Sequence, residues 1–206
     1  MATPARAQSK SEATRERILD ATAEVLNAKG YAGTRLSDIA ELARVQPTAV
    51  YYYFNSRDEV IGEAVQEGVR RVLASVEREL AALPASATPM DRIEAAVAGH
   101  LQATLRDSKY GAVAIRLASS LPPALREAQL VDERRYGVLW RTLIADATRT
   151  GQLNPALDPA AARMFVLGAL NWAAEWFNPS RGSLARTIST AQLMIRQGLS
   201  APSEET

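Results

Sequence analysis

Three consecutive tyrosines, Tyr51, Tyr52 and Tyr53, are the residues whose type and spacing point most directly to a chemistry of recognition. They lie in the stretch 34–57, T-R-L-S-D-I-A-E-L-A-R-V-Q-P-T-A-V-Y-Y-Y-F-N-S-R, which is predicted to form two short helices joined by a tight turn. Successive residues on a helix point in different directions, so three adjacent tyrosines cannot all face a core and at least one must be exposed. An exposed tyrosine ring can pack on a sugar or a thymine methyl group, and its hydroxyl can bond a phosphate. The triple therefore predicts contact with double-stranded DNA.

The two short helices are the elements that must position these tyrosines. The second is predicted to begin at Pro47, where the missing N–H costs nothing, and to end near Asn55. Val50 and Phe54 then face the core. The first is expected to be capped by Thr34 and to break at 44–46, with four core-facing residues: Leu36, Ile39, Ala40 and Ala43. This pattern is typical of a helix-turn-helix, in which the second helix enters the major groove.

The total charge of the chain gives DNA binding little support. The chain has 24 basic and 23 acidic residues, a formal net charge of +1. Up to Arg57 there are eight basic and six acidic residues. DNA binding must therefore follow from the placement of individual side chains, not from net charge. Arg57, just past the second short helix, is the cation expected to meet the DNA backbone.

The composition is that of a soluble globular protein, with 47% hydrophobic, 23% charged and 6% aromatic residues. The absence of cysteine excludes disulfides and cysteine-built zinc sites, and it fits a reducing cytoplasm. The N-terminal residues M-A-T-P-A-R lack an apolar signal core. No run approaches the roughly 18 apolar residues of a membrane helix. We expect an intracellular, cytoplasmic protein.

Motifs of catalysis are absent from the sequence. It contains no G-x-S-x-G elbow, phosphate-binding glycine loop or dinucleotide fingerprint. A single histidine, His100, cannot build a histidine-rich metal site. The carboxylates Asp132 and Glu133 lie in a charged stretch and are interpreted as solvated. We therefore expect no enzymatic activity, no cofactor and no metal, with carboxylate chemistry in a helical body as the weaker alternative.

The whole chain is predicted to be all-α, with about nine helices and no strand. A first helix is expected from Ser9, as a capping residue, to about Lys29, with Gly30 as a left-handed cap. A long helix of about 25 residues opens at Ser56, and the segment Pro84–Pro89 is a predicted linker. The remaining helices are expected at 90–108, 112–120, 122–150, 159–177 and 183–197.

The stretch 30–60 resembles the N-terminal signature of the TetR/AcrR family of transcriptional regulators. The resemblance covers Arg15 to Ile61 and rests on Ile39-Ala40, on 50–54 and on Arg57. It implies base-facing residues at Gln46, Pro47, Thr48, Ala49 and Tyr52, and phosphate contacts at Thr34, Ser37, Tyr51, Tyr53 and Arg57. The chain departs from the family at Gln46, where serine is common, and at Pro47, where lysine or arginine is common. The operator sequence is therefore not carried over by the resemblance.

The family layout implies a helix-turn-helix domain at 9–57 and a ligand-binding and dimerisation domain at 58–199. It also implies that the last two helices pair with a second subunit. The residues agree with this layout, because the helix 159–177 is apolar around much of its circumference and carries Trp172 and Trp176. The last helix has apolar residues at helical spacing, namely Leu184, Ile188, Ala191, Met194 and Ile195. The alternative is that both are core helices of a monomer; a dimer is favoured because a single helix-turn-helix usually binds DNA too weakly.

A ligand site is expected among the helices between Met90 and Asn178. Eight polar or aromatic side chains are candidates to line it: His100, Thr104, Tyr110, Arg116, Tyr136, Trp140, Asn171 and Trp172. Each has an alternative structural explanation, since a lone histidine is more often a hydrogen-bonded core residue and tryptophans more often pack. The segment G-A-L-N-W-A-A-E-W-F-N-P is loosely similar to relatives that respond to lipid-like or acyl-CoA effectors.

Together these features predict a homodimeric, ligand-responsive regulator that binds a palindromic operator. Repression is expected rather than activation, from the resemblance alone. The expected partners are operator DNA, a small-molecule effector and a second copy of the chain. The alternative is a dimeric helical module that binds a small molecule or a protein and does not read DNA.

Overall fold

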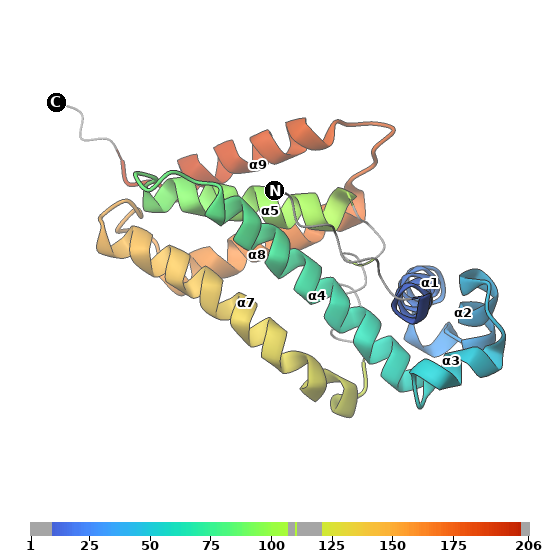
Figure 1. The fold of residues 1–206 in the computed structure, drawn as a ribbon. Coiled ribbons are helices and arrows are strands. Elements are labelled where there is room, and N and C mark those ends of the chain that lie inside the picture. The colour runs from blue at the N-terminus through green and yellow to red at the C-terminus, as the bar shows by residue number, and fades with distance from the viewer. Residues whose placement is uncertain (1–9, 107–109, 111–120, 203–206) are drawn as a thin grey trace, which may run out of the picture.

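The computed structural model describes residues 10–106, 110 and 121–202, and these residues are almost entirely helical (Figure 1). The described residues form eight helices, namely α1 (Lys10–Gly33), α2 (Leu36–Ala43), α3 (Pro47–Tyr53), α4 (Arg57–Ala81), α5 (Pro89–Arg106), α7 (Pro123–Arg149), α8 (Pro159–Trp176) and α9 (Leu184–Leu199). The only β-type pairing within the described part is an isolated bridge between Leu153 and Ser200. The predicted all-α class is confirmed. The expected helix at 112–120, like Ser9, lies outside the described residues.

Helices α1–α3 form a head at one end of the molecule, on the right in Figure 1. Its core includes Ile18 and Leu26 of α1, Ile39 of α2 and Val50 of α3, all of which are buried. Phe54 closes this core just after α3, as its spacing from Val50 predicted. The first turns of α4 complete the head core, so the head and the long helix share one apolar cluster.

In the described part of the chain five helices form the body, and α5 is their central element. It packs against α4, α7, α8 and α9. The body core surrounds Trp140 of α7, Leu101 of α5 and Leu170 of α8, all fully buried. Helix α4 runs diagonally from the body to the head and connects the two (Figure 1). No helix in the described part of the chain is long and apolar enough to cross a membrane.

Backbone turns between the head helices follow the residue types. Gly30 has φ 66° and ψ 177°, which kinks α1; the positive φ agrees with the prediction, but the ψ is not that of a left-handed cap, and α1 continues to Gly33. The turn between α2 and α3 is made by Arg44, whose φ of 57° and ψ of 47° are left-handed. At the start of α4, Ser56 Oγ accepts a hydrogen bond from Glu59 N at 3.1 Å, while Glu59 accepts one from Asn55 N at 2.6 Å. Ser56 thus caps α4, while Glu59 reaches back to the residue before the cap and not to the N–H of Ser56 itself.

Thr34 does not cap α2 as predicted. The N-cap residue is Arg35, and no side chain supplies a capping hydrogen bond there. The hydroxyl of Thr34 instead donates to the carbonyl oxygen of Gly30 at 2.7 Å. The positive φ of Gly30 turns the chain back, and Thr34 becomes buried against the end of α1.

The crossing of α4 and α5 depends on a glycine. A Cβ atom at Gly99 would lie 2.7 Å from Val76 Cα and 2.8 Å from Ser75 O, both backbone atoms of α4. No real Cβ is accommodated at such distances without a shift of the backbone. The two helices therefore meet in direct backbone contact at this point, and Gly99 sets how closely α4 approaches the body.

Candidate nucleic-acid interface and effector site

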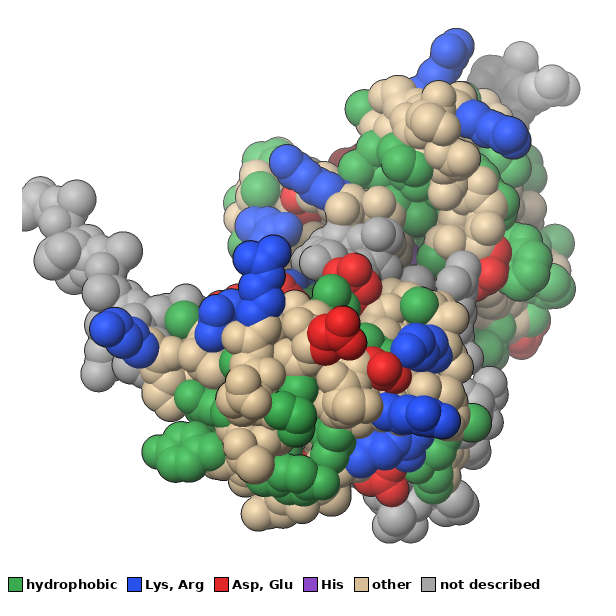
Figure 2. Space-filling view, turned by 90° about the vertical axis from the view of Figure 1, so that its right-hand side faces the viewer, with side chains coloured by type: hydrophobic (Ala, Val, Ile, Leu, Met, Phe, Trp, Pro, Cys, Tyr) green, Lys and Arg blue, Asp and Glu red, His purple; other side chains and the backbone are tan. Residues whose placement is uncertain are grey.

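Helix α3 presents two tyrosines to solvent. The side chain of Tyr52 is 80% exposed and that of Tyr51 is 59% exposed. Val50, on the opposite side of the same helix, is buried in the head core. The preceding residues Gln46, Pro47 and Thr48 are exposed as well, and Ala49 is half-buried. Figure 2 views the molecule from the head end and shows hydrophobic, basic and acidic side chains there. The structure thus brings the predicted base-facing residues together on one helix surface.

Tyr53 has a different position from its two neighbours. It is half-buried and packs against the head core. Its ring meets the ring of Tyr52 edge-to-face, with centroids 5.1 Å apart. This geometry is favourable for aromatic pairs and limits the rotation of Tyr52. Tyr53 therefore holds Tyr52 in place from the protein side.

The residues predicted to contact phosphate differ in their exposure. Ser37, near the start of α2, is exposed. Thr34 is buried, and its hydroxyl is already bonded to Gly30. Its side chain is not presented to a DNA backbone in this conformation, because the turn after Gly30 directs it inward.

Arg57 is directed into the head rather than outward. Its Nε donates to the carbonyl oxygen of Thr34 at 2.7 Å, and its NH2 group donates to the carbonyl oxygen of Tyr31. The guanidinium lies 4.5 Å from the centroid of the Tyr31 ring, and it pairs with Asp58 at 2.9 Å. The first turn of α4 points back at the α1–α2 connection, whose free carbonyls need donors. The expectation that Arg57 reaches outward is therefore corrected: it fastens the head to α4.

Two cations beside the helix-turn-helix were missed by the sequence-based selection. Arg35, the N-cap residue of α2, and Arg44, in the turn before α3, are both exposed. Within the described residues, neither side chain makes a recorded hydrogen bond or ion pair. The signal that could have found them was their position at the two ends of α2, where a helix-turn-helix lies near the sugar-phosphate backbone.

A buried polar cluster lies in the body between α5 and α7. His100 Nδ1 and the hydroxyl of Tyr136 are 2.6 Å apart, and the ring of Tyr136 meets that of Trp140 edge-to-face at 6.3 Å. Burial raises the pKa of Tyr136, so its phenol stays protonated and can donate to Nδ1. The proton of the neutral imidazole then lies on Nε2. The fold thus joins three of the predicted ligand residues.

Two nitrogens of this cluster have no hydrogen-bond partner among the described residues. They are His100 Nε2 and Trp140 Nε1, and both side chains are almost fully buried. The indole nitrogen lies near the Tyr136 hydroxyl without making a hydrogen bond of normal geometry. An unpaired buried donor costs about 1–3 kcal/mol. An acceptor group on a bound molecule would remove that cost.

The pH dependence of stability should report the burial of His100. Burial lowers the pKa of His100 from 6.5 to about 4. Between these values the unfolded chain binds more protons than the folded one, so stability falls as pH falls through this window. The free energy of unfolding is expected to drop by about 2 kcal/mol between pH 7 and pH 5 from this group alone. Urea unfolding at both pH values measures it.

The matched variant for this experiment is His100→Gln, which keeps a polar side chain without the titration. Its unfolding free energy should lose about 2 kcal/mol less than the wild type over the same pH interval. An equal pH dependence in both proteins would show that His100 is accessible to protons in the folded state.

The other predicted ligand residues are not gathered at this cluster. The hydroxyl of Thr104, one turn along α5, donates to the carbonyl oxygen of His100 at 2.9 Å. Tyr110 packs instead in the head core, and its hydroxyl donates to Asp20 Oδ1 at 2.7 Å. Asn171 is half-buried on α8, and Trp172 is 67% exposed on the outer face of that helix. Arg116 lies outside the described residues. The assignments of Tyr110 and Trp172 to the interior site are therefore corrected.

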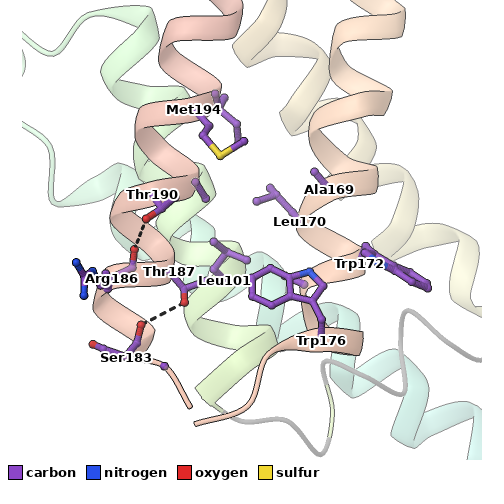
Figure 3. A pocket seen from close by; sticks show the side chains of 14 residues that line it. Leu101, Ala169, Leu170, Trp172, Trp176, Ser183, Arg186, Thr187, Thr190 and Met194 are labelled. Carbon is purple, nitrogen blue, oxygen red and sulfur yellow. Dashed lines mark hydrogen bonds between the residues drawn. The ribbon is translucent and has the colours of Figure 1, made fainter. Parts of the chain in front are cut away.

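Helices α8 and α9 border an open apolar hollow of about 470 Å³. Figure 3 shows Leu170 and Trp176 of α8 facing Met194 of α9 across it, with Leu101 of α5 between the two helices. The hydroxyls of Thr187 and Thr190 donate to backbone carbonyls of α9, so they add little polarity to the hollow. Arg196 holds α9 to α5 through Asp91 and Glu94. The hollow is thus flanked by two fixed helices with exposed apolar side chains.

Comparison with known proteins decides the family. The family model "Bacterial regulatory proteins, tetR family" matches residues 18–64, and "Tetracyclin repressor-like, C-terminal domain" matches residues 86–193, more than half of the chain. The chain belongs to the TetR family. It is therefore a DNA-binding, ligand-responsive transcriptional regulator, and the matched parts coincide with the head and with most of the body.

Individual TetR-family proteins are similar over most of their length. The HTH-type transcriptional regulator BetI of Burkholderia thailandensis is 30% identical over 163 residues, 76% of each chain. A tetR-family regulatory protein from Rhodococcus RHA1 has a TM-score of 0.81 at 21% identity, covering 95% of this chain and 100% of its own. The regulator FadR from Bacillus subtilis, solved with stearoyl-CoA, has a TM-score of 0.73 at 19% identity, covering 89% and 98%. The two solved structures support the TetR fold.

Proposed function

We propose that this TetR-family regulator acts in the cytoplasm as a repressor that binds a palindromic operator through α3 and is released by a small effector. The observation that supports the operator contact is the exposed face of α3, where Tyr51 and Tyr52 stand out from a buried head core. Large exposed aromatics on a short helix are unfavourable in water unless a partner covers them. With residues 9–57 as the DNA-binding domain, the partner is the major groove, contacted by 46–49 and Tyr52.

The proposed assembly is a homodimer formed through α8 and α9, within a body domain of residues 58–199. Phe165, Trp172 and Met194 are each more than half exposed on these helices. Trp172 and Met194, together with Trp176, also border the open hollow described above. A second copy of the chain would cover this apolar surface by two-fold symmetry. Two heads can then contact half-sites about one DNA turn apart, ~34–36 Å.

The proposed effector is an acyl-CoA or another lipid-like molecule that carries a carbonyl group. The buried donor His100 Nε2 needs an acceptor, and the neutral imidazole has no charge with which to hold a carboxylate. The surrounding core is apolar, with Trp140 and Leu101 fully buried. The likeness to FadR solved with stearoyl-CoA agrees with an acyl effector. His100, Tyr136 and Trp140 are the residues proposed to meet it.

Release follows from α4, which is continuous between body and head. Because Gly99 brings the backbone of α5 against α4, a ligand that displaces α5 must also displace α4. The head is fastened to the start of α4 by Arg57. A displacement of α4 changes the separation of the two α3 helices in the dimer, and the dimer then no longer fits successive grooves.

A gel-shift with the DNA immediately upstream of the protein's own gene tests this function. The wild-type protein should retard this fragment and not an unrelated fragment of equal length. Palmitoyl-CoA should release it at micromolar concentration. Retardation of both fragments alike, or of neither, would favour the alternative of a helical module without sequence-specific DNA binding.

A further inference from the structure

A second, basic hollow lies on the other side of α5, between α5 and α4. It has a volume of about 300 Å³ and is bordered by Arg71 and Arg78 of α4 and Arg106 of α5. Residues seven apart on a helix share a face, which places Arg71 and Arg78 along the same wall. The guanidinium of Arg78 donates to Ser75 Oγ at 2.9 Å, and no carboxylate pairs with Arg78 or Arg106 among the described residues. These two cations remain available to an anion.

An apolar hollow of about 560 Å³ adjoins the basic one, and Arg106 borders both. Its walls include Leu105 of α5, Phe177 after α8 and Leu184 of α9. A molecule with an anionic end and an apolar part could therefore occupy the two hollows at once, with Arg106 between them. Guanidinium groups bind phosphate through two parallel hydrogen bonds, which favours phosphate over an uncharged polar group.

Arg71 connects the basic hollow with the DNA-binding head. Its guanidinium lies 3.9 Å from the centroid of the Tyr110 ring and pairs with Glu67 at 2.9 Å. It is also 3.8 Å from Asp20 and 3.9 Å from Glu16, both on α1 of the head. Asp20 accepts the hydrogen bond of Tyr110, which is buried in the head core. An anion in the hollow would compete with these α1 carboxylates for Arg71.

We propose that the hollow between α4 and α5 is a phosphate-binding subsite for the coenzyme A part of the effector, and that Arg71 couples its occupancy to α1. The subsite rests on the proposed function, because it assigns the charged end of an effector whose release of DNA is proposed above. Phosphate in the hollow draws Arg71 from Asp20 and Glu16. Asp20 and Glu16 of α1 then lose their ion pairs with Arg71 of α4, and α1 is freed to move relative to α4.

Calorimetric titration with free coenzyme A, which has the phosphates without an acyl chain, tests the subsite. The wild-type protein is expected to bind it, and the double variant Arg78→Gln with Arg106→Gln should bind at least about tenfold more weakly, since each loses a charge-assisted hydrogen bond. The control Arg141→Gln removes an exposed body arginine away from both hollows and should bind as the wild type does. Inorganic pyrophosphate distinguishes binding of phosphate alone from binding of the whole coenzyme.

Two results would overturn the subsite: equal coenzyme A affinity in the wild type and the double variant, or no binding by the wild type. Operator release by palmitate with coenzyme A inactive would overturn the subsite and leave the proposed regulator standing. If the wild-type protein retards no operator but the double variant still loses coenzyme A binding, the proposed regulator is overturned and the subsite stands.

The coupling is tested with Tyr110→Phe, which keeps the ring beside Arg71 and removes only the hydroxyl. Coenzyme A affinity should not change. The factor by which palmitoyl-CoA weakens operator binding should fall at least about threefold, because the hydrogen bond from Tyr110 to Asp20 of α1 is lost. A factor equal to that of the wild type would show that Arg71 and Tyr110 do not transmit the signal.

Discussion

Replacing Tyr52 with alanine is expected to weaken operator binding by about 10- to 100-fold, because a good base contact contributes about 1–3 kcal/mol. Tyr52 is the most exposed tyrosine of α3 and is one of the predicted base-facing residues. Its ring contacts the protein chiefly through the edge of Tyr53, so its loss should leave the fold intact. Fluorescence anisotropy with labelled operator DNA measures the affinity, and circular dichroism checks the fold.

Two comparisons make the Tyr52 experiment decisive. Tyr52→Phe keeps the ring and should retain most of the affinity if the ring packs on a base or sugar. Val138→Ala shortens an exposed apolar side chain of α7, away from the head, and should have no effect on DNA binding. Unchanged operator affinity in Tyr52→Ala would remove α3 from the interface as we have assigned it.

Arg57→Ala is expected to act on the head itself. The substitution removes the side-chain donor to the carbonyl oxygens of Thr34 and Tyr31, of which Tyr31 keeps only the long bond from Thr34 N at 3.4 Å, and it removes the cation from the Tyr31 ring. Loss of affinity in this variant should therefore come with a lower melting temperature. In Tyr52→Ala the loss of affinity comes without it. Operator affinity and melting temperature, measured together, therefore distinguish a residue that contacts DNA from one that positions the head.

Replacing Gly99 with alanine should give the largest loss of stability of any single added methyl group considered. The new Cβ would lie 2.7–2.9 Å from backbone atoms of Ser75 and Val76, and backbone cannot move aside as a flexible side chain can. Overpacking of this kind costs about 1–3 kcal/mol, and we expect about 2 kcal/mol for alanine and more for valine. For a chain of this size the melting temperature falls by about 4–8 °C. Differential scanning calorimetry measures it.

Gly137→Ala in α7 is the matched control for Gly99. Its Cβ would meet only the end of the flexible Arg141 side chain at 3.5 Å, an ordinary contact. Alanine in the middle of a helix is favoured over glycine by up to about 1 kcal/mol, so this variant should be slightly more stable than the wild type. A Gly99→Ala protein as stable as the wild type would mean that α4 and α5 separate at low cost, and the proposed route of release would have no rigid contact at that point.

Local chemistry allowed the head to be predicted closely. The burial of Val50 and Phe54 follows from their four-residue spacing on one side of a short helix, and the exposure of Tyr51 and Tyr52 follows from the same geometry. Pro47 at the first position of α3 and Ser56 before α4 have conformational preferences that act within one turn of chain. Neighbours in sequence determine such features, so no knowledge of distant contacts is needed.

The sequence by itself thus determined the all-α class, the helix-turn-helix and the exposed tyrosine face, while the tertiary structure decided which partners distant side chains found. Arg57 binds carbonyls of the α1–α2 connection, and Tyr110 crosses from the body to Asp20 in the head. Trp172 lies on the outer face of α8, whereas Trp140, of the same type, is fully buried. These differences depend on how whole helices pack against one another. Residue type and spacing limit which faces are apolar, but they leave open which other face each one meets.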